Sequence, residues 1–356
     1  MLGRPRRLAV LAEGSFNPLD AKTAVGVVRY RAMDVAAVID STRAGRTASD
    51  CAGVGGAIPV VRDLGEAAVL GADSLLIGIA PKGGDLPDAW RAWVRDALAR
   101  GWDVLSGLHV FLADDSEFAA IARESGARIV DVRRPPAGRP VAARRAASVD
   151  ALVVLTVGSD CNVGKMTTAL ELERELRERG TKAAFVATGQ TGLFIAERGV
   201  PMDAVASDFV AGFMEQEVIE ASKEAEIVLV EGQGAIHHPG YSGVTLSLLH
   251  GAAPAALVLC HEHGRETVRD RDLEIPPLPE LVLAYEMAAS WVSPTRVAGI
   301  ALNTWKVTEP EARRALDVAA RSSGLPATDP VRFGVAELAD ALLDVAAARR
   351  ARATHA

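Results

Sequence analysis

The stretch LVVLTVGSDCNVGKMTTALELERELRERG, residues 152–180, decides the expected fold of the second half of the chain. An apolar run leads into a loop bounded by Gly158 and Gly164, and Lys165 then begins a segment of good helix formers. In a P-loop, successive backbone N–H groups and a helix N-terminus attract phosphate oxygens, and a lysine adds a point charge. The stretch therefore predicts a P-loop for a phosphate-bearing nucleotide or coenzyme. Its expected cofactor-binding residues are Gly158, Ser159, Asp160, Cys161, Asn162, Val163, Gly164, Lys165, Met166, Thr167 and Thr168.

Two features of this loop depart from a standard P-loop. Five residues rather than four separate Gly158 from Gly164, and Met166 follows the lysine where a standard P-loop has the hydroxyl that ligates Mg²⁺. Thr167 and Thr168 can still contact phosphate oxygens from the first helical turn. The sequence therefore favours a phosphate site that does not require magnesium.

A strand-end acid follows in EAEIVLVEGQGAIHHPGYSG, residues 224–243. Glu231 ends a predicted buried strand beside the loop, which is the position of a Walker-B-type acid that orders a metal ion or water. Gly232 and Gly234 would let the backbone pass close to a ligand. A strand-end glutamate is also common as a merely solvated residue, but the two flanking glycines favour a functional role.

The whole chain is expected to form two α/β domains. Its 356 residues exceed what one core usually organises. Short apolar runs alternate with helical patterns in both halves, which indicates parallel sheets. We expect a first domain at residues 1–132, a Pro- and Arg-rich linker at 133–150 and the P-loop domain at 151–356. The first domain lacks the GxGxxG fingerprint, so Asp40 is interpreted as a cap or turn residue rather than a ribose-binding acid.

Composition excludes several classes of function. A net charge of −7 with scattered arginines disfavours a nucleic-acid platform. Cys51, Cys161 and Cys260 fit neither a zinc spacing nor a disulfide framework, so a reducing cytoplasm is expected. No stretch approaches the roughly 20 apolar residues that would span a bilayer, so no membrane partner is expected. A homo-oligomer would be ordinary for a cytoplasmic enzyme.

Three motifs carry a family resemblance. GSDCNVGK, VEGQGA and GIALNTW together resemble the dethiobiotin-synthetase-like branch of P-loop proteins, over about residues 152–334, and by that resemblance Asn303 would contact an adenine. The longer segments GSDCNVGKMTT, residues 230–265 and ATDPVRFG resemble a bacterial P-loop family whose members carry a Rossmann-like domain in front. That resemblance covers essentially the whole chain. One branch of the family is D-glutamate N-acetyltransferase, which would use acetyl-coenzyme A.

The resemblance implies a first hypothesis and two rivals. The first is an N-acetyltransferase that acts on an acidic, D-glutamate-like amino acid, with acetyl-coenzyme A at the P-loop. It accounts for Met166, because coenzyme A offers phosphates without phosphoryl transfer. The rival enzyme is an ATP- and Mg²⁺-dependent ligase or kinase like dethiobiotin synthetase, in which Glu231 and a threonine would hold the metal. The third hypothesis is a non-catalytic, nucleotide-gated switch.

Acyl transfer to an amine needs a base, a donor to the thioester oxygen and cations for the acceptor's carboxylates. Polar side chains for these roles lie after the predicted strands, where ligands bind in open α/β sheets. The catalytic candidates are Glu231, His237, His238 and Asp208. The substrate-binding candidates are Gln190, Thr191, Gln233, Tyr241, Ser242, His261 and Arg265.

Several candidates have a structural alternative. His237 and His238 are adjacent and cannot face one pocket equally, so at most one is expected to be catalytic. Arg265 could grip a carboxylate or pair with Glu262. Asp208 could hold an amine or cap the helix predicted at 208–222.

No metal site is assigned from the sequence. The run from His261 to His263 has two histidines but no convincing third ligand. Cys161 could be a nucleophile, because a helix N-terminus lowers the pKa of a thiol, but a small filler of the loop is the favoured role.

Overall fold

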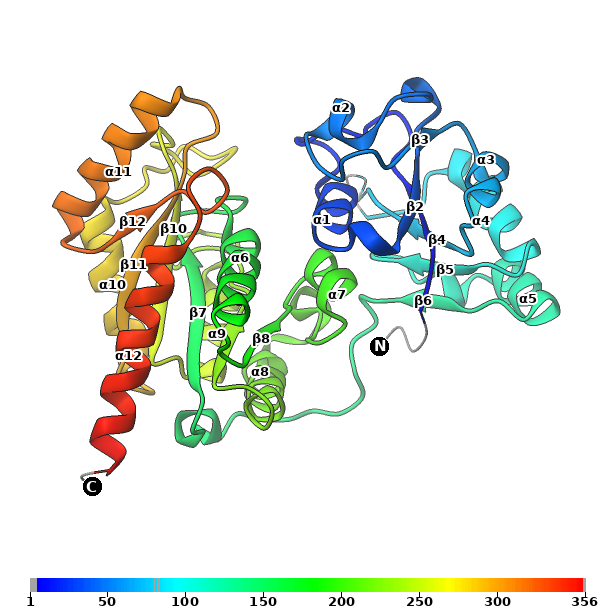
Figure 1. Cartoon of the computed structure of the whole chain (residues 1–356). Coiled ribbons are helices and arrows are strands. Elements are labelled where there is room, and N and C mark those ends of the chain that lie inside the picture. Colours follow the sequence, from blue (N-terminus) through cyan, green and yellow to red (C-terminus); the bar gives the residue numbers. More distant parts are fainter. Residues whose placement is uncertain (1–4, 80, 82–83, 355–356) are drawn as a thin grey trace. The chain divides into compact units, whose positions relative to one another are not determined.

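The computed structural model describes residues 5–79, 81 and 84–354. It forms two compact units, each built around a six-stranded parallel sheet (Figure 1). The N-terminal unit comprises Met1–Pro136 together with Gly189–Glu197, and the P-loop unit comprises Ala137–Thr188 and Arg198–Ala356. The expected class, two α/β domains with parallel sheets, is confirmed.

The N-terminal unit has the strand order β3-β2-β1-β4-β5-β6, with the order reversing between β1 and β4 as in a Rossmann-like sheet. Its strands are β1 Leu8–Leu11, β2 Val35–Ile39, β3 Val60–Val61, β4 Ser74–Ile77, β5 Asp103–Ser106 and β6 Ile129–Asp131. Its helices are α1 Lys22–Tyr30, α2 Ala48–Ala52, α3 Leu64–Val69, α4 Asp88–Ala99, α5 Ser116–Ser125 and α7 Gln190–Ala196.

Asp40 is a structural residue of the N-terminal unit. It follows β2, is fully buried, and its carboxylate accepts the backbone N–H groups of Gly14, Phe16 and Thr42 at 3.0–3.1 Å. Both oxygens are therefore used to hold the loop after β1 and the turn after β2. This confirms the interpretation of Asp40 as a cap and turn residue.

Helix α7 comes from the second half of the sequence but packs in the N-terminal unit, beside α1 (Figure 1). The hydroxyls of Thr191 and Thr23 hydrogen-bond at 2.8 Å. The Arg31 guanidinium donates to the Phe194 carbonyl at 2.9 Å and pairs with Glu197 at 3.0 Å. Phe194 is fully buried. The N-terminal unit therefore takes part of its core from a segment that follows β8 in the chain.

The P-loop unit has the strand order β12-β11-β10-β7-β9-β8. Helices α6 and α12 cover one face of this sheet, and α8 to α11 cover the other (Figure 1). The P-loop strand β7 is central, and its neighbours are β10 and β9. The strands are β7 Leu152–Gly158, β8 Ala183–Val186, β9 Ile227–Val230, β10 Ala256–Glu262, β11 Arg296–Asn303 and β12 Ala327–Thr328. The helices are α6 Lys165–Glu178, α8 Ser207–Ser222, α9 Ser242–Ala252, α10 Leu278–Ser290, α11 Glu309–Ser323 and α12 Ala336–Thr354.

The segment at the start of the P-loop unit is anchored rather than free. Glu215 on α8 is fully buried and accepts the backbone N–H groups of Ala143 at 3.0 Å and Arg145 at 2.6 Å. Its carboxylate also pairs with the Arg145 guanidinium at 2.9 Å. A buried carboxylate is stable only with such partners, so this part of the predicted linker is held on the P-loop unit.

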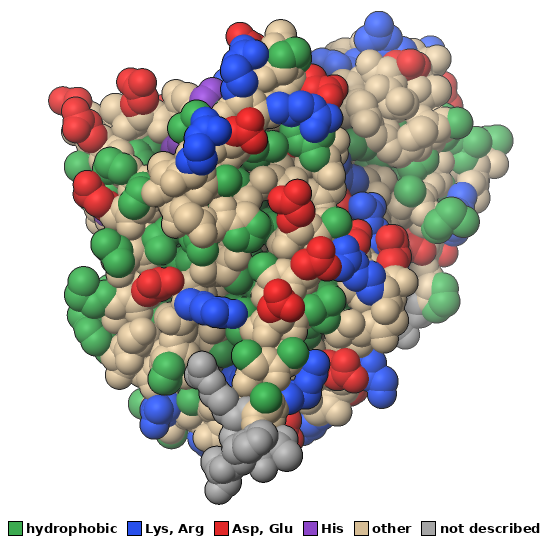
Figure 2. Space-filling model, turned by 60° about the vertical axis from the view of Figure 1, so that its left-hand side comes forward, with side chains coloured by type: hydrophobic (Ala, Val, Ile, Leu, Met, Phe, Trp, Pro, Cys, Tyr) green, Lys and Arg blue, Asp and Glu red, His purple; other side chains and the backbone are tan. Residues whose placement is uncertain are grey.

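The surface shows mixed charge. On the face drawn in Figure 2, basic and acidic side chains lie side by side instead of forming one continuous basic area. Among the helices of the described part of the chain, none is both long and apolar enough to cross a bilayer.

Candidate functional site

The P-loop follows the central strand β7 and leads directly into α6. Asn162 and Gly164 have positive φ angles of 56° and 106°, which turn the chain sharply before the helix begins at Lys165. Lys165 is buried, and its Nζ donates to the Asp160 carbonyl at 2.7 Å, so the ammonium lies over the loop. The first N–H groups of a helix have no partner within the helix, and together with this ammonium they form a site for phosphate oxygens.

Asp160 determines the shape of the loop. It is fully buried and accepts the Arg265 guanidinium at 2.9 Å, the backbone N–H of Arg269 at 2.8 Å and that of Cys161 at 2.7 Å. Burial raises the pKa of Asp160, but these hydrogen bonds outweigh it and keep the pKa below its ordinary value. The carboxylate is thus charged and engaged by the protein itself.

Arg265 connects the P-loop to the end of β10. Beyond Asp160, its guanidinium donates to the Cys161 carbonyl at 2.8 Å and to the Glu262 carboxylate at 2.6 Å. Lys306 pairs with the other oxygen of Glu262 at 2.6 Å. Of the two roles considered for Arg265, the structure shows the pair with Glu262, and the guanidinium is occupied in bracing the loop.

His261 lies against the base of the loop. Its Nδ1 is 2.7 Å from the Ser159 hydroxyl. Burial, and then the nearby charges of Arg265 and His263, lower the pKa of His261 to about 4. The imidazole is therefore neutral at pH 7 and can accept the Ser159 proton. This substrate-binding candidate touches the P-loop itself.

The first turn of α6 divides into core and open positions. Met166 and Val163 are buried. The Thr168 hydroxyl accepts the Cys260 thiol at 3.6 Å, within the core, where burial raises the pKa of Cys260 to about 11. Thr167 is half-buried, and its hydroxyl makes no hydrogen bond with any residue in the described part of the chain. Thr167 is therefore the first-turn hydroxyl available to a ligand.

Glu231 lies at the end of β9 in a compact polar network. Its carboxylate accepts the Thr188 backbone N–H at 3.0 Å, and its carbonyl accepts the Thr188 hydroxyl at 2.9 Å. The Gln233 side-chain amide donates to the same hydroxyl at 3.0 Å. Gly232 then passes close to the P-loop lysine, because a Cβ added there would lie 3.1 Å from Lys165 Cδ. The backbone after Glu231 thus lies next to the P-loop and its lysine.

The two adjacent histidines have different environments. His238 is buried, its Nδ1 accepts the Gly240 N–H at 3.0 Å, and its ring stacks on Tyr241 with centroids 4.5 Å apart. His237 has two buried ring nitrogens without a hydrogen-bond partner among the residues described here. Burial lowers the pKa of His237, although Asp160 opposes this effect.

One cluster has the residue types of a metal site. Potential ligand atoms of Asp160, Cys161 and His238 all lie within 4.8 Å of one another. The Asp160 oxygens are already bonded to Arg265 and Arg269, and a cation would meet the Arg265 guanidinium. The cluster instead shows that His238 faces the tip of the P-loop.

The remaining candidates belong to several elements of the two units. Gln190 and Thr191 belong to α7 in the N-terminal unit, where Thr191 is buried. Asp208 is exposed in the first turn of α8. Tyr241 is half-exposed and Ser242 begins α9. Asn303 ends β11, and its side-chain oxygen accepts the Trp305 N–H at 3.3 Å.

Tyr285 supports the P-loop, although no sequence pattern identifies it as part of the site. Its ring is fully buried on α10, its hydroxyl donates to the Gly158 carbonyl at 2.7 Å, and the Ile236 N–H donates to the same hydroxyl at 2.9 Å. Burial raises its pKa above the ordinary value. Tyr285 thus joins the first residue of the loop to the segment that carries His237. In sequence it resembles any apolar position of an amphipathic helix.

Replacing Tyr285 by phenylalanine should lower the free energy of unfolding by about 1–3 kcal/mol, because two buried backbone groups lose their partner. Urea denaturation followed by circular dichroism measures this. Tyr241→Phe is the matched control, since the Tyr241 hydroxyl makes no hydrogen bond within the described chain and that variant should retain its stability. Equal stability of the two variants would contradict the supporting role of Tyr285.

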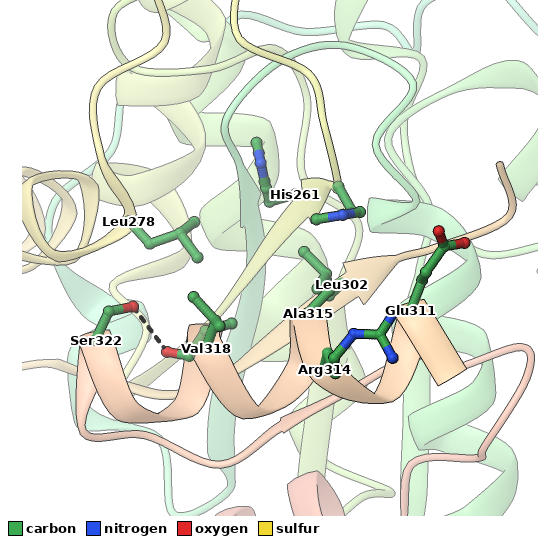
Figure 3. A pocket seen from close by; sticks show the side chains of 10 residues that line it. His261, Leu278, Leu302, Glu311, Arg314, Ala315, Val318 and Ser322 are labelled. Atoms are coloured by element: carbon green, nitrogen blue, oxygen red, sulfur yellow. Dashed lines mark hydrogen bonds between the residues drawn. The ribbon is translucent and has the colours of Figure 1, made fainter. Parts of the chain in front are cut away.

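Two adjoining hollows open beside the P-loop, and both are lined by His261 and Leu278. The first has a volume of about 370 Å³ and runs along α11 from Glu311 to Ser322 (Figure 3). The second, of about 410 Å³, is bordered by Arg265 and the loop that precedes α10. A ligand with phosphates on the loop therefore has room to extend past His261.

Both halves of the chain match domains of one protein family, and a solved structure from that family has the same fold. Residues 140–339 match the domain of unknown function DUF1611_C, described as a P-loop domain, and residues 41–135 match the Rossmann-like domain DUF1611_N. A crystal structure of a DUF1611 family protein from Anabaena variabilis superposes with a TM-score of 0.90 at 39% identity, covering 95% of this chain and 99% of that one.

Two curated relatives carry the same name. A D-glutamate N-acetyltransferase of Tritonibacter scottomollicae is 42% identical over 287 residues, which cover 79% of this chain and 84% of that protein. Another from Pseudoalteromonas sp. is 35% identical over 272 residues, covering 76% and 81%.

Proposed function

The chain belongs to the DUF1611 family, and from that premise we propose that it is an N-acetyltransferase that transfers the acetyl group of acetyl-coenzyme A to the amine of an acidic amino acid such as D-glutamate. The observation that carries the proposal is the identity of 42% and 35% to two proteins named D-glutamate N-acetyltransferase, over three quarters of the chain.

The P-loop fits the phosphates of such a coenzyme. Lys165 and the N–H groups of the loop and of the first turn of α6 would hold the pyrophosphate, and Thr167 could add a hydroxyl. Met166 is buried in place of the hydroxyl that ligates magnesium in a standard P-loop, which supports a ligand that needs no metal. By family resemblance, Asn303 would contact the adenine. Acetyl-coenzyme A, when bound, supplies an activated acetyl thioester.

The two adjacent histidines, His237 and His238, suit different catalytic roles. Since His238 Nδ1 accepts the Gly240 N–H, a neutral His238 carries its proton on Nε2 and is a hydrogen-bond donor, suited to a developing oxyanion. His237 has a lowered pKa and no partner among the described residues, so a neutral His237 keeps a lone pair that can take the proton of an amine. Glu231 is held by Thr188, whose hydroxyl also accepts the Gln233 side-chain amide.

Calorimetric titration tests the proposal. Acetyl-coenzyme A should bind without a metal ion, whereas ATP should bind feebly with or without Mg²⁺. Incubation with D- and L-glutamate and D- and L-aspartate should then release free coenzyme A with at least one of them. Tight magnesium-dependent ATP binding with no response to acetyl-coenzyme A would refute the proposal and favour an ATP-dependent ligase.

A further inference from the structure

The hollow along α11 has two chemically different ends (Figure 3). Leu278, Leu302 and Val318 give it an apolar wall, whereas Glu311 and Arg314 lie at the other end. Val318 is 57% exposed, so the apolar wall is open to a ligand. An aromatic ring beside an anionic group is the shape and polarity that these two ends would accept.

The cation at the polar end, Arg314, attracts the Glu311 carboxylate but forms no direct ion pair with it in the described structure. Within the described parts of the chain, Arg314 makes no ion pair or hydrogen bond. Glu311 is three residues away, but its carboxylate accepts the backbone N–H of Thr308 at 2.9 Å and the Thr308 hydroxyl at 2.7 Å in the cap of α11. The adjacent Arg313, in contrast, pairs with Glu309 at 2.7 Å and lies over the Phe333 ring at 4.4 Å. Arg314 is therefore free to hold an anionic ligand.

The hollow is linked to the P-loop through His261, which touches both. His261 lines it and bonds Ser159 of the loop at 2.7 Å. Leu302 also lines it and directly precedes Asn303, the residue expected to contact the adenine. A coenzyme whose pyrophosphate sits on the loop can therefore extend its nucleoside past His261 toward the end of β11.

Building on the proposed function, we propose that this hollow receives the adenosine end of coenzyme A and that Arg314 binds its 3′-phosphate. The adenine would lie on the apolar wall, and the guanidinium would hold the phosphate with two parallel hydrogen bonds. Neither ATP nor dephospho-coenzyme A carries this phosphate. Arg314 is then the residue by which a P-loop distinguishes coenzyme A from an ordinary nucleotide.

The experiment compares the affinities of coenzyme A and dephospho-coenzyme A, which differ only in the 3′-phosphate, by calorimetry. Wild-type protein should prefer coenzyme A by roughly 10- to 100-fold, as expected for a charge-assisted bidentate contact. Arg314→Ala should remove most of that preference and leave the affinity for dephospho-coenzyme A unchanged. Arg313→Ala, which alters the neighbouring paired arginine, should keep the preference.

The outcomes separate this inference from the function on which it rests. If Arg314→Ala keeps the wild-type preference, or if the wild type shows none while binding both ligands, the assignment of Arg314 is wrong and the acetyltransferase proposal stands. If neither ligand binds the folded wild-type protein, both are wrong. Circular dichroism confirms folding of the variants, and Arg314 is exposed, so its replacement should leave the fold intact.

Discussion

Replacing Lys165 by alanine should weaken acetyl-coenzyme A binding by about 100-fold or more. The ammonium lies over the loop, 2.7 Å from the Asp160 carbonyl, where its charge can attract the phosphates of the coenzyme. A hydrogen bond to a charged group is worth about 1.5–3 kcal/mol, and the lost Coulombic attraction adds to it. Isothermal titration calorimetry gives the dissociation constant directly.

Lys182→Ala is the control for this experiment. Lys182 is exposed just before β8 and lines neither hollow, so its replacement should leave affinity unchanged. Lys165→Ala should also keep its far-ultraviolet circular dichroism, because the remaining loop contacts of Asp160, Ser159 and Tyr285 do not involve the lysine side chain. An unchanged dissociation constant in folded Lys165→Ala would eliminate the P-loop as the coenzyme site.

Replacing Gly232 by alanine should lower the free energy of unfolding by about 3 kcal/mol or more. A Cβ at this position would lie 1.7 Å from the Thr156 carbonyl oxygen, which is backbone of the central strand and cannot rotate away. The Gly232 N–H also donates to the Thr156 hydroxyl at 3.0 Å, so moving the chain apart would break that bond. Overpacking of this kind costs about 1–3 kcal/mol even where neighbours can shift. Urea denaturation measures the loss, and weakened coenzyme binding should accompany it.

Gly243→Ala provides the contrast. Gly243 lies in the first turn of α9, and an added Cβ would meet no atom within 4 Å. Because alanine is the better helix former, this variant should be as stable as the wild type or more stable by up to about 1 kcal/mol. A Gly232→Ala protein that unfolds at the same urea concentration as Gly243→Ala would show that the two strands tolerate separation at this point.

The P-loop could be predicted from sequence because its signal is local. The strand before Gly158, the two glycines and Lys165 are consecutive, and the structure places them as expected in β7, the loop and the start of α6. Glu231 could also be placed, since parallel strands end at a common edge. In both cases the residues that determine the local structure lie within a short stretch of sequence.

Other parts of the site depend on contacts between distant residues. Tyr285 meets Gly158 across 127 positions, and nothing near Tyr285 in sequence distinguishes it from a core residue. The ion pairs of Arg265 with Asp160 and Glu262 likewise cannot be predicted without knowing which strands are neighbours. Gln190 and Thr191 are predicted from sequence as substrate-binding residues that follow a strand. The structure places them at the start of α7, whose buried residues pack in the N-terminal unit, and periodicity alone cannot reveal this packing.

The placement of α7 also has a consequence for synthesis of the protein. Chains emerge from the ribosome N-terminus first, and domains generally fold as they appear. The N-terminal unit, however, includes Gly189–Glu197, which is made only after β7, α6 and β8 of the other unit. Its six strands are therefore complete while helix α7, which packs beside α1, is still missing and much of the P-loop unit is translated. A ribosome that pauses between residues 136 and 189 would leave the place of Phe194 in the N-terminal unit empty, and apolar surface open to a chaperone.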